Sequence, residues 1–397
     1  MKYKRIFLIV MDSVGVGHGK DSPKFGDSPL SNTILNIDTN TSGLYLPTLE
    51  SIGLGYFDNY KFIKPVKNPN AIIMRMNEVS NGKDTMTGHW EMMGLKIEKP
   101  FKTFTDTGFP KELIDELERR TGYKTCGNKS ASGTEIIKEL GEHQLKTKEL
   151  IVYTSSDSVL QIAANEAIWP IEEQYRICEI ARDITMKDEW KVGRIIARPF
   201  VGETADTFVR TKKRHDYALS PFAPTYLDSL KDAKYDVVAI GKIVDIFNGC
   251  GVTEFEKTTS NDDGMDKTIR IAKEKDFTGL CFVNLVDFDM DYGHRRNVVG
   301  YKECLEQFDK RLDEFLKVMR DDDLLIITAD HGNDPTQPGT DHTREQVPAI
   351  FYSKSIKDAG GYFGETDNFG LLGTVVADNF KVSKKSLLTA KYPEKLL

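Results

Sequence analysis

Short apolar runs alternate with amphipathic segments along most of the chain. The apolar runs have the length of buried strands and cover residues 5–11, 71–76, 235–240, 281–286 and 324–328. The clearest amphipathic segment lies between Tyr301 and Met319, where apolar residues recur at steps of three and four. This alternation predicts an α/β fold with a mostly parallel sheet and helices on both faces.

A middle segment has helix and strand patterns of its own. Ser132 and Glu135 have the spacing of a capping box at the start of a helix, and apolar runs at 150–153 and 192–197 predict strands. The candidate catalytic residues described below lie on both sides of this segment, and no metal motif lies within it. We therefore predict a catalytic core interrupted by a smaller inserted α/β cap domain, with the core at 1–99 and 224–397 and the cap at 100–223.

Three of the predicted strands lead directly into an aspartate. Asp12 follows the first apolar run, Asp289 follows the run at 281–286, and Asp330 follows the last run. Open α/β sheets bind ligands at the carboxyl ends of their strands, so we expect these carboxylates to lie close together. Histidines accompany two of the three. One such pair alone is more often a loop dipeptide with a surface histidine, but the recurrence favours a single metal site built from distant segments.

The candidate ligands exceed what one catalytic zinc ion uses, because such an ion usually takes three protein ligands. They suit two divalent ions, the arrangement that holds both the attacking and the leaving oxygen of a phosphoryl transfer. Oxygen and nitrogen ligands without a thiolate favour Mn²⁺, Mg²⁺ or Zn²⁺. The six predicted ligands are Asp12, Asp289, His294, Asp330, His331 and His342.

Thr85 is the candidate nucleophile. It lies in a glycine-flanked turn after the apolar run at 71–76, so its hydroxyl is able to point at the metals. A free hydroxyl is a weak nucleophile, and coordination to a metal is one way to activate it. The alternative is a helix N-cap threonine, which this motif alone favours about equally because Gly and Thr are common in turns.

Composition describes an ordinary enzyme of two domains. The chain has 397 residues, more than one core typically holds, and a net charge of −7. The sequence has no basic stripe of the kind that would indicate a nucleic-acid partner. No apolar segment is long enough for a membrane span, and Asp12 interrupts the only run that resembles a signal peptide, so we expect a cytoplasmic protein. The five scattered cysteines lack metal spacing, and Cys281 and Cys304 are expected to be reduced core residues.

A phosphate ligand of an acidic protein requires local positive charge. Guanidinium groups suit phosphate oxygens, and arginines cluster between residues 194 and 214. The alternative is a solvated basic face, which fits Lys212 and Lys213 better than the arginines that interrupt a strand-like run. Asp157 is expected to accept sugar hydroxyls, and Lys242 follows the run at 235–240. The predicted substrate contacts are Asp157, Arg194, Arg198, Arg210, Arg214 and Lys242.

Together these motifs resemble those of the bacterial phosphopentomutase family, which belongs to the alkaline phosphatase superfamily. The matching stretches occur in the family's order across most of the chain, at Asp12, 83–91 (KDTMTGHWE), 287–289 (DFD), 293–296 (GHRR), 328–334 (TADHGND) and 339–345 (GTDHTRE). One position departs from the pattern, because the family often has Asp where this chain has Asn297. Asn297 is not a predicted ligand, so we expect activity to be kept.

The resemblance implies an alkaline phosphatase-like core, a cap that closes over the metals, and two Mn²⁺ ions. It implies that Asp12, Asp330, His331 and Thr85 surround one metal. It assigns the other metal to the remaining three ligands, Asp289, His294 and His342. It also supports three of the substrate contacts named above, Asp157, Arg194 and Lys242.

The implied substrate is a small-molecule sugar phosphate. A phosphorylated Thr85 donates its phosphoryl group to ribose 1-phosphate, ribose 5-phosphate or their 2-deoxy forms, giving a bisphosphate whose other phosphate returns to Thr85. A trace of sugar bisphosphate is needed as activator to prime Thr85. A metal-dependent phosphatase or phosphodiesterase would share the ligands and the hydroxyl nucleophile but would let water attack the phosphorylated enzyme. Cofactor-independent phosphoglycerate mutase uses serine as nucleophile, and a phosphate-binding or metal-storage module needs neither a hydroxyl beside the metals nor a cap.

Overall fold

The computed structural model describes residues 1–155, 158–357 and 360–397. These residues form two compact units, each with its own sheet and core. The larger unit consists of Met1–Lys99 and Ser220–Leu397, and the smaller unit is Pro100–Leu219. Among the described residues, no helix is both long enough and apolar enough to cross a membrane.

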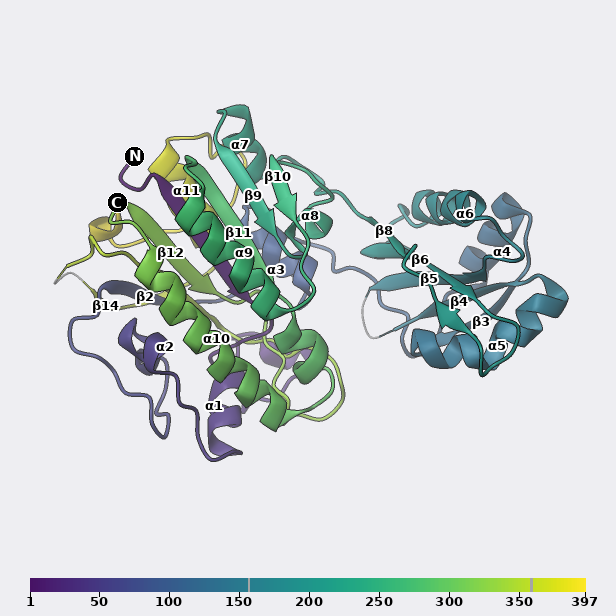
Figure 1. Ribbon diagram of the computed structural model, residues 1–397, viewed down its shortest axis with the longest axis horizontal. Helices are drawn as coiled ribbons and strands as arrows, with labels where there is room; N and C mark the ends of the chain where they lie inside the picture. The colour runs from purple at the N-terminus through teal and green to yellow at the C-terminus, as the bar shows by residue number, and fades with distance from the viewer. Residues whose placement is uncertain (156–157, 358–359) are drawn as a thin grey trace. The chain divides into compact units, whose positions relative to one another are not determined.

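The larger unit is built on an eight-stranded sheet (Figure 1). In spatial order its strands are β10 (Glu254–Glu256), β9 (Asp236–Ile240), β11 (Gly279–Leu285), β1 (Arg5–Met11), β12 (Asp323–Thr328), β13 (Val347–Tyr352), β2 (Ala71–Met76) and β14 (Gly361–Thr366). Only β13 is antiparallel to its neighbours. The strands β1, β11 and β12 are buried along their whole length, as expected for parallel strands covered on both faces. The predicted fold class is confirmed.

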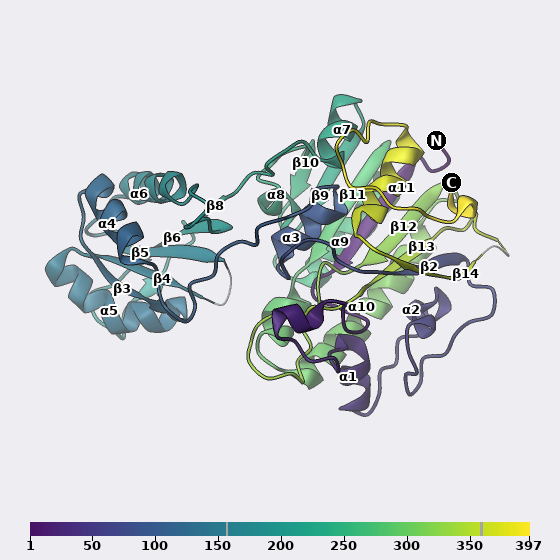
Figure 2. The same cartoon turned by 180° about the vertical axis from the view of Figure 1, so that it is seen from behind.

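Helices cover both faces of this sheet. Figures 1 and 2 show α9 (Asn261–Glu274) and α10 (Val298–Val318) on one face and α11 (Gly370–Phe380) on the other. The remaining helices of this unit are α1 (Thr33–Thr39), α2 (Pro47–Ser51), α3 (Thr85–Met92), α7 (Tyr226–Asp232) and α8 (Ile243–Ile246), with short 3₁₀ turns at Ser22–Phe25, Leu54–Tyr56 and Glu394–Leu396.

The long helix α10 forms where the apolar periodicity predicts it. Its buried side chains recur every three or four residues and include Tyr301, Leu305 and Phe308. The N-cap is Asn297, whose side-chain oxygen accepts the N–H of Gly300 at 2.9 Å. Asn and Asp serve about equally well as N-caps, so the departure from the family pattern at Asn297 keeps the capping function.

The smaller unit has a six-stranded sheet flanked by three helices. Its strands are β3 (Thr125–Ser130), β4 (Leu150–Thr154), β5 (Val159–Asn165), β6 (Arg194–Val201), β7 (Val209–Arg210) and β8 (His215–Ala218), in the order β3-β4-β5-β6-β7 with β8 paired to β6. Its helices are α4 (Lys111–Thr121), α5 (Gly133–Thr147) and α6 (Ile171–Ile184). Alternate residues of β4 enter separate apolar clusters, one shared with α4 and α6 and the other with α5.

Two local predictions for this chain are wrong, and a third element is present with a shifted start. Ser132 stands at the N-cap of α5, but its side chain accepts no hydrogen bond there, so the capping box does not form. The strand expected from residue 192 begins at Arg194. Cys304 is only half-buried, beside the amide of Asn261, although Cys281 is a core residue as expected.

Candidate functional site

The three predicted carboxylate ligands lie at the carboxyl ends of three adjacent strands. Asp12 follows β1 and Asp330 follows β12. Asp289 belongs to a single turn of π-helix, Phe288–Gly293, that follows β11. Because β1 pairs in parallel with both β11 and β12, all three carboxylates are delivered to the same edge of the sheet.

Asp12, Asp330 and His331 form the first cluster. One ligand atom from each lies within 4.8 Å of the others, and all three residues are buried. His331 Nε2 is 3.4 Å from Asp12 Oδ1 and 3.4 Å from Asp330 Oδ2. Within the part of the chain that the structure describes, these two carboxylate oxygens are buried and have no hydrogen-bond partner. Such atoms are costly to bury unless something satisfies them, so the cluster fits a cation.

Asp289, His294 and His342 form the second cluster, with ligand atoms again within 4.8 Å of one another. Asp289 Oδ2 is 3.0 Å from His294 Nε2 and 3.4 Å from His342 Nε2. The His342 ring stacks on the His331 ring at a centroid distance of 3.9 Å. The two clusters are therefore neighbours, as a two-ion site requires.

Backbone carbonyls determine which nitrogen of each histidine faces the clusters. His294 Nδ1 lies 2.7 Å from the carbonyl oxygen of Thr340, and His342 Nδ1 lies 2.7 Å from that of Lys83. His331 Nδ1 is 3.1 Å from the carbonyl of the next residue. A carbonyl only accepts hydrogen bonds, so each neutral ring carries its proton on Nδ1. The Nε2 lone pair is then available to a metal. This is the usual arrangement for histidine ligands whose other ring nitrogen donates to a backbone carbonyl.

The carboxylates repel one another where the imidazoles do not offset their charge. Burial raises the pKa of Asp12 well above its usual range, and the nearby Asp330 and Asp289 raise it further. Burial also raises the pKa of Asp289, but His342 and His294 outweigh it and hold that pKa well below the usual range. Burial lowers the pKa of His331, which keeps this ring neutral and able to bind a metal at neutral pH.

Thr85 is the first residue of α3 and lies beside the first cluster. The N-cap of α3 is Asp84, whose carboxylate accepts the N–H of Thr87 at 3.1 Å. The interpretation of Thr85 as an N-cap is therefore wrong. Its hydroxyl oxygen lies 3.3 Å from His331 Nε2. A Cβ on Gly88 would lie 2.2 Å from the carbonyl oxygen of Asp330, so a glycine lets α3 approach the ligand loop this closely.

Three polar residues that support the ligands were not among the predicted site residues. Asn284 donates to Asp12 Oδ2 at 2.9 Å, and Asn333 donates to Asp289 Oδ1 at 2.7 Å. His89 is fully buried, and its Nδ1 donates to the carbonyl oxygen of Thr85 at 2.8 Å while lying 3.2 Å from Asp330 Oδ2. Asn284 had a usable signal, since it is a polar residue inside the apolar strand β11.

Of the two predicted substrate contacts outside the arginine cluster, the structure describes only Lys242. Lys242 is the N-cap of α8, directly after β9, and its charge opposes the burial and repulsion that raise the pKa of Asp12. It therefore lies on the same side of the sheet as the ligands. Asp157 lies outside the described residues.

All four predicted arginines lie in the smaller unit, and three of them surround one cavity. Arg198, Arg210 and Arg214 line one cavity of about 580 Å³. Arg194 is not among its lining residues and faces Asp216 at 3.6 Å. The carboxylate of Asp216 also accepts two hydrogen bonds from Arg214, each of 2.7 Å. Three guanidinium groups around one cavity form a site suited to an anion.

Comparisons with known proteins find similar proteins along nearly the whole chain. The model of the metalloenzyme superfamily matches residues 4–384. The chain is 54% identical over 399 residues to the phosphopentomutase of Clostridium tetani, covering 100% of both chains. It is 57% identical over 381 residues to the phosphopentomutase of Agathobacter rectalis, covering 96% of each. Among solved structures it is similar to the PH0037 protein from Pyrococcus horikoshii, with a TM-score of 0.48 and 14% identity over 96% of this chain and 99% of that one.

Proposed function

The chain belongs to the phosphopentomutase family, and we propose that it interconverts ribose 1-phosphate and ribose 5-phosphate, together with the 2-deoxyribose phosphates. It is an isomerase that acts as an intramolecular phosphotransferase. The finer proposal is that Thr85 carries the phosphoryl group and that two Mn²⁺ ions occupy the two ligand clusters. One observation carries it: a threonine hydroxyl lies 3.3 Å from His331 Nε2, at the edge of two adjoining clusters of candidate metal ligands.

The residues divide the chemistry between them. The two clusters would hold the ions, which when bound polarise phosphoryl oxygens and neutralise developing charge. Thr85 gives up its phosphoryl group to the free hydroxyl of the sugar phosphate and later receives the other phosphate of the bisphosphate intermediate. The packing of α3 on the Asp330 loop keeps the Thr85 oxygen in place throughout, because reactivity depends on how closely the reacting atoms are held.

The proposal also gives the positive charges outside the clusters a role. Lys242 would contact a substrate oxygen at the carboxyl edge of the larger sheet. The arginine-lined cavity of the smaller unit would bind a phosphate group, with Arg198, Arg210 and Arg214 as its donors. Arg194 and Asp157 stay predicted substrate contacts. A sugar bisphosphate would activate the enzyme by priming Thr85.

A phosphatase is the rival with the same groups, because it differs only in letting water attack the phosphothreonine. The test incubates the purified, Mn²⁺-loaded protein with ribose 5-phosphate and a trace of sugar bisphosphate, and follows ribose 1-phosphate and inorganic phosphate together. We expect isomerisation to exceed phosphate release by a wide margin. Release of phosphate at the rate of substrate consumption would replace the mutase proposal with the phosphatase.

A further inference from the structure

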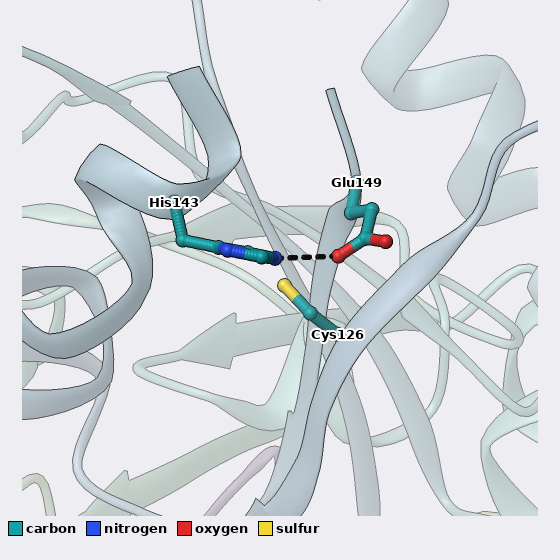
Figure 3. A group of neighbouring side chains, drawn as sticks. All are labelled: Cys126, His143 and Glu149. Carbon is teal, nitrogen blue, oxygen red and sulfur yellow. Dashed lines mark hydrogen bonds and ion pairs between the residues drawn. The ribbon is translucent and has the colours of Figure 1, made fainter. Parts of the chain in front are cut away.

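The smaller unit contains a third group of candidate metal ligands, which shares no residue with the proposed function. Cys126, His143 and Glu149 each offer one ligand atom, and these atoms lie within 4.8 Å of one another. Figure 3 shows the three side chains pointing toward a common centre. His143 Nε2 and Glu149 Oε2 are 2.6 Å apart. This group is a sulfur, nitrogen and oxygen set, whereas the two clusters of the larger unit contain no thiol.

Three consecutive elements bring these residues together. Cys126 is on the edge strand β3, which pairs in parallel with β4. His143 is on α5, the helix that connects the two strands, and Glu149 immediately precedes β4. The turn between α5 and β4 is held in shape, because Lys148 adopts a left-handed conformation (φ 60°) and the Gln144 side chain donates to the carbonyl oxygen of Glu149 at 2.9 Å. The carboxylate of Glu149 is thereby turned back toward the helix.

The geometry fits a small thiophilic cation. Zn²⁺ takes thiolate at about 2.3 Å and imidazole or carboxylate at about 2.0–2.2 Å in a tetrahedron, so neighbouring ligand atoms lie roughly 3.3–3.7 Å apart around it. The three ligand atoms here lie within 4.8 Å of one another, so side-chain rotations would bring them to that spacing, and three protein ligands leave a fourth position for water. We propose that Cys126, His143 and Glu149 form a third metal site, for Zn²⁺ or another thiophilic divalent ion.

Without an ion, the thiol at this site carries a proton that metal binding would displace. Burial raises the pKa of Cys126 to about 12, and Glu149 raises it further, so the free side chain is a thiol. On binding, a sulfur–metal bond forms, the S–H bond breaks, and that proton leaves to solvent. To bind through Nε2, a neutral His143 ring carries its proton on Nδ1, so the thiol supplies the proton that is released. Affinity therefore rises with pH, as it does for metal sites that release protons.

An ion at this site would stabilise the edge of the smaller sheet. All residues of β3 are exposed or only half-buried, and an edge strand has pairing partners on one side alone. The metal would join β3 to α5 and to the start of β4. Because the ion binds only the folded arrangement, it would raise the unfolding temperature.

The test uses Co²⁺, whose bond to thiolate gives charge-transfer absorption in the near ultraviolet that oxygen and nitrogen ligands do not give. Full-length protein is first loaded with Mn²⁺ and then titrated with Co²⁺. We expect wild type to gain this band with one Co²⁺ per chain and Cys126→Ser to lack it. His143→Gln, on the surface of α5, should keep its fold and bind Co²⁺ at least about tenfold more weakly. Cys250→Ser is the control, since this half-buried cysteine of the larger unit belongs to none of the three ligand groups and should keep the band.

Thermal unfolding gives an independent measurement. With Mn²⁺ already present, added Zn²⁺ should raise the unfolding temperature of wild type and Cys250→Ser by more than that of Cys126→Ser, which keeps the two clusters of the larger unit but lacks the thiol. The proposal is overturned if saturated wild type shows no thiolate band, if Cys126→Ser keeps the band, or if His143→Gln binds Co²⁺ as tightly as wild type. None of these readouts depends on catalysis, so failure here leaves the proposed function standing, and the reverse also holds.

Discussion

At the scale of single residues, the candidate ligands are aimed by groups that are not ligands themselves. Amide side chains donate to the carboxylates of Asp12 and Asp289, and backbone carbonyls fix the imidazole tautomers. Such supporting contacts commonly account for tenfold to about a hundredfold of metal affinity. The sequence predicts the ligand types, but these supporting contacts depend on loops that meet only in the folded chain.

His342 is the candidate ligand whose loss is most informative, because its ring contacts both clusters. His342→Ala removes one of three ligands from the second cluster and the stacking partner of His331. We expect the variant to retain about one ion fewer per chain than wild type and to lose turnover. Elemental analysis after dialysis measures this. An unchanged metal content would contradict the assignment of His342 as a ligand.

Glu345 should make stability depend on pH in an unusual direction. Burial raises its pKa to about 8, well above the value near 4.3 expected in the unfolded chain. The folded state therefore keeps a proton that the unfolded state loses, and the stability contributed by this group is complete below about pH 4.3 and is lost as pH rises to about 8.

The measurement is the free energy of unfolding by denaturant between pH 5 and 8. Across this window Glu345 should lower stability by at most about 1.4 kcal/mol per pH unit. Glu345→Gln should be less stable at pH 5, since it loses an oxygen that accepts hydrogen bonds from Thr33, yet its stability should change less with pH. Parallel profiles for the two proteins would show that Glu345 is ionised throughout.

At the scale of elements, the two ends of the central strands have separate tasks. The carboxyl ends hold the ligands, and the amino ends are joined by a buried ion pair. Arg5 on β1 donates two hydrogen bonds of 2.7 Å to Asp323 on β12, and both side chains are fully buried. The same guanidinium also donates to the carbonyls of Ala272 and Lys275, which gives it four hydrogen bonds in all.

Breaking this pair should cost stability and leave the metals in place. Asp323→Ala leaves the Arg5 charge buried without its partner, which typically costs about 3–5 kcal/mol. Denaturant unfolding measures the loss, and Asp322→Ala, an exposed neighbour, serves as the control with a change below about 0.5 kcal/mol. If the two variants were equally stable, the buried pair would not be what joins β1 to β12.

At the scale of the whole molecule, the sequence predicts five of the eight strands of the large sheet and misses β10, β13 and β14. The five predicted strands are largely apolar runs and are recognisable as such, whereas β10 is a three-residue, mostly exposed strand at one edge of the sheet. The strand β13 contains Pro348, which lacks an N–H for the ladder and argues against a central strand, although β13 lies between β12 and β2. The edge strand β14 is largely exposed and contains glycines, so it has no apolar signal.

The candidate site shows the same division. Its carboxylates were predictable because parallel strands bring their carboxyl ends together. The stacking of His331 on His342 and the burial of His89 depend on how α3 and the loop before β13 pack, which no spacing in the sequence encodes. The third ligand group was missed for a similar reason, since its cysteine, histidine and glutamate come from three separate elements without a spacing motif.

The most direct test of the account is the covalent state of Thr85. Wild-type protein is incubated with a bisphosphorylated ribose and Mn²⁺, digested, and mapped by mass spectrometry, alongside Thr85→Val, which keeps the shape of the side chain without its hydroxyl. The account predicts that wild type gains the mass of one phosphoryl group on the peptide containing Thr85, while Thr85→Val binds both metals and gains none. A phosphoryl group on another residue, or equal labelling of the two proteins, would contradict it.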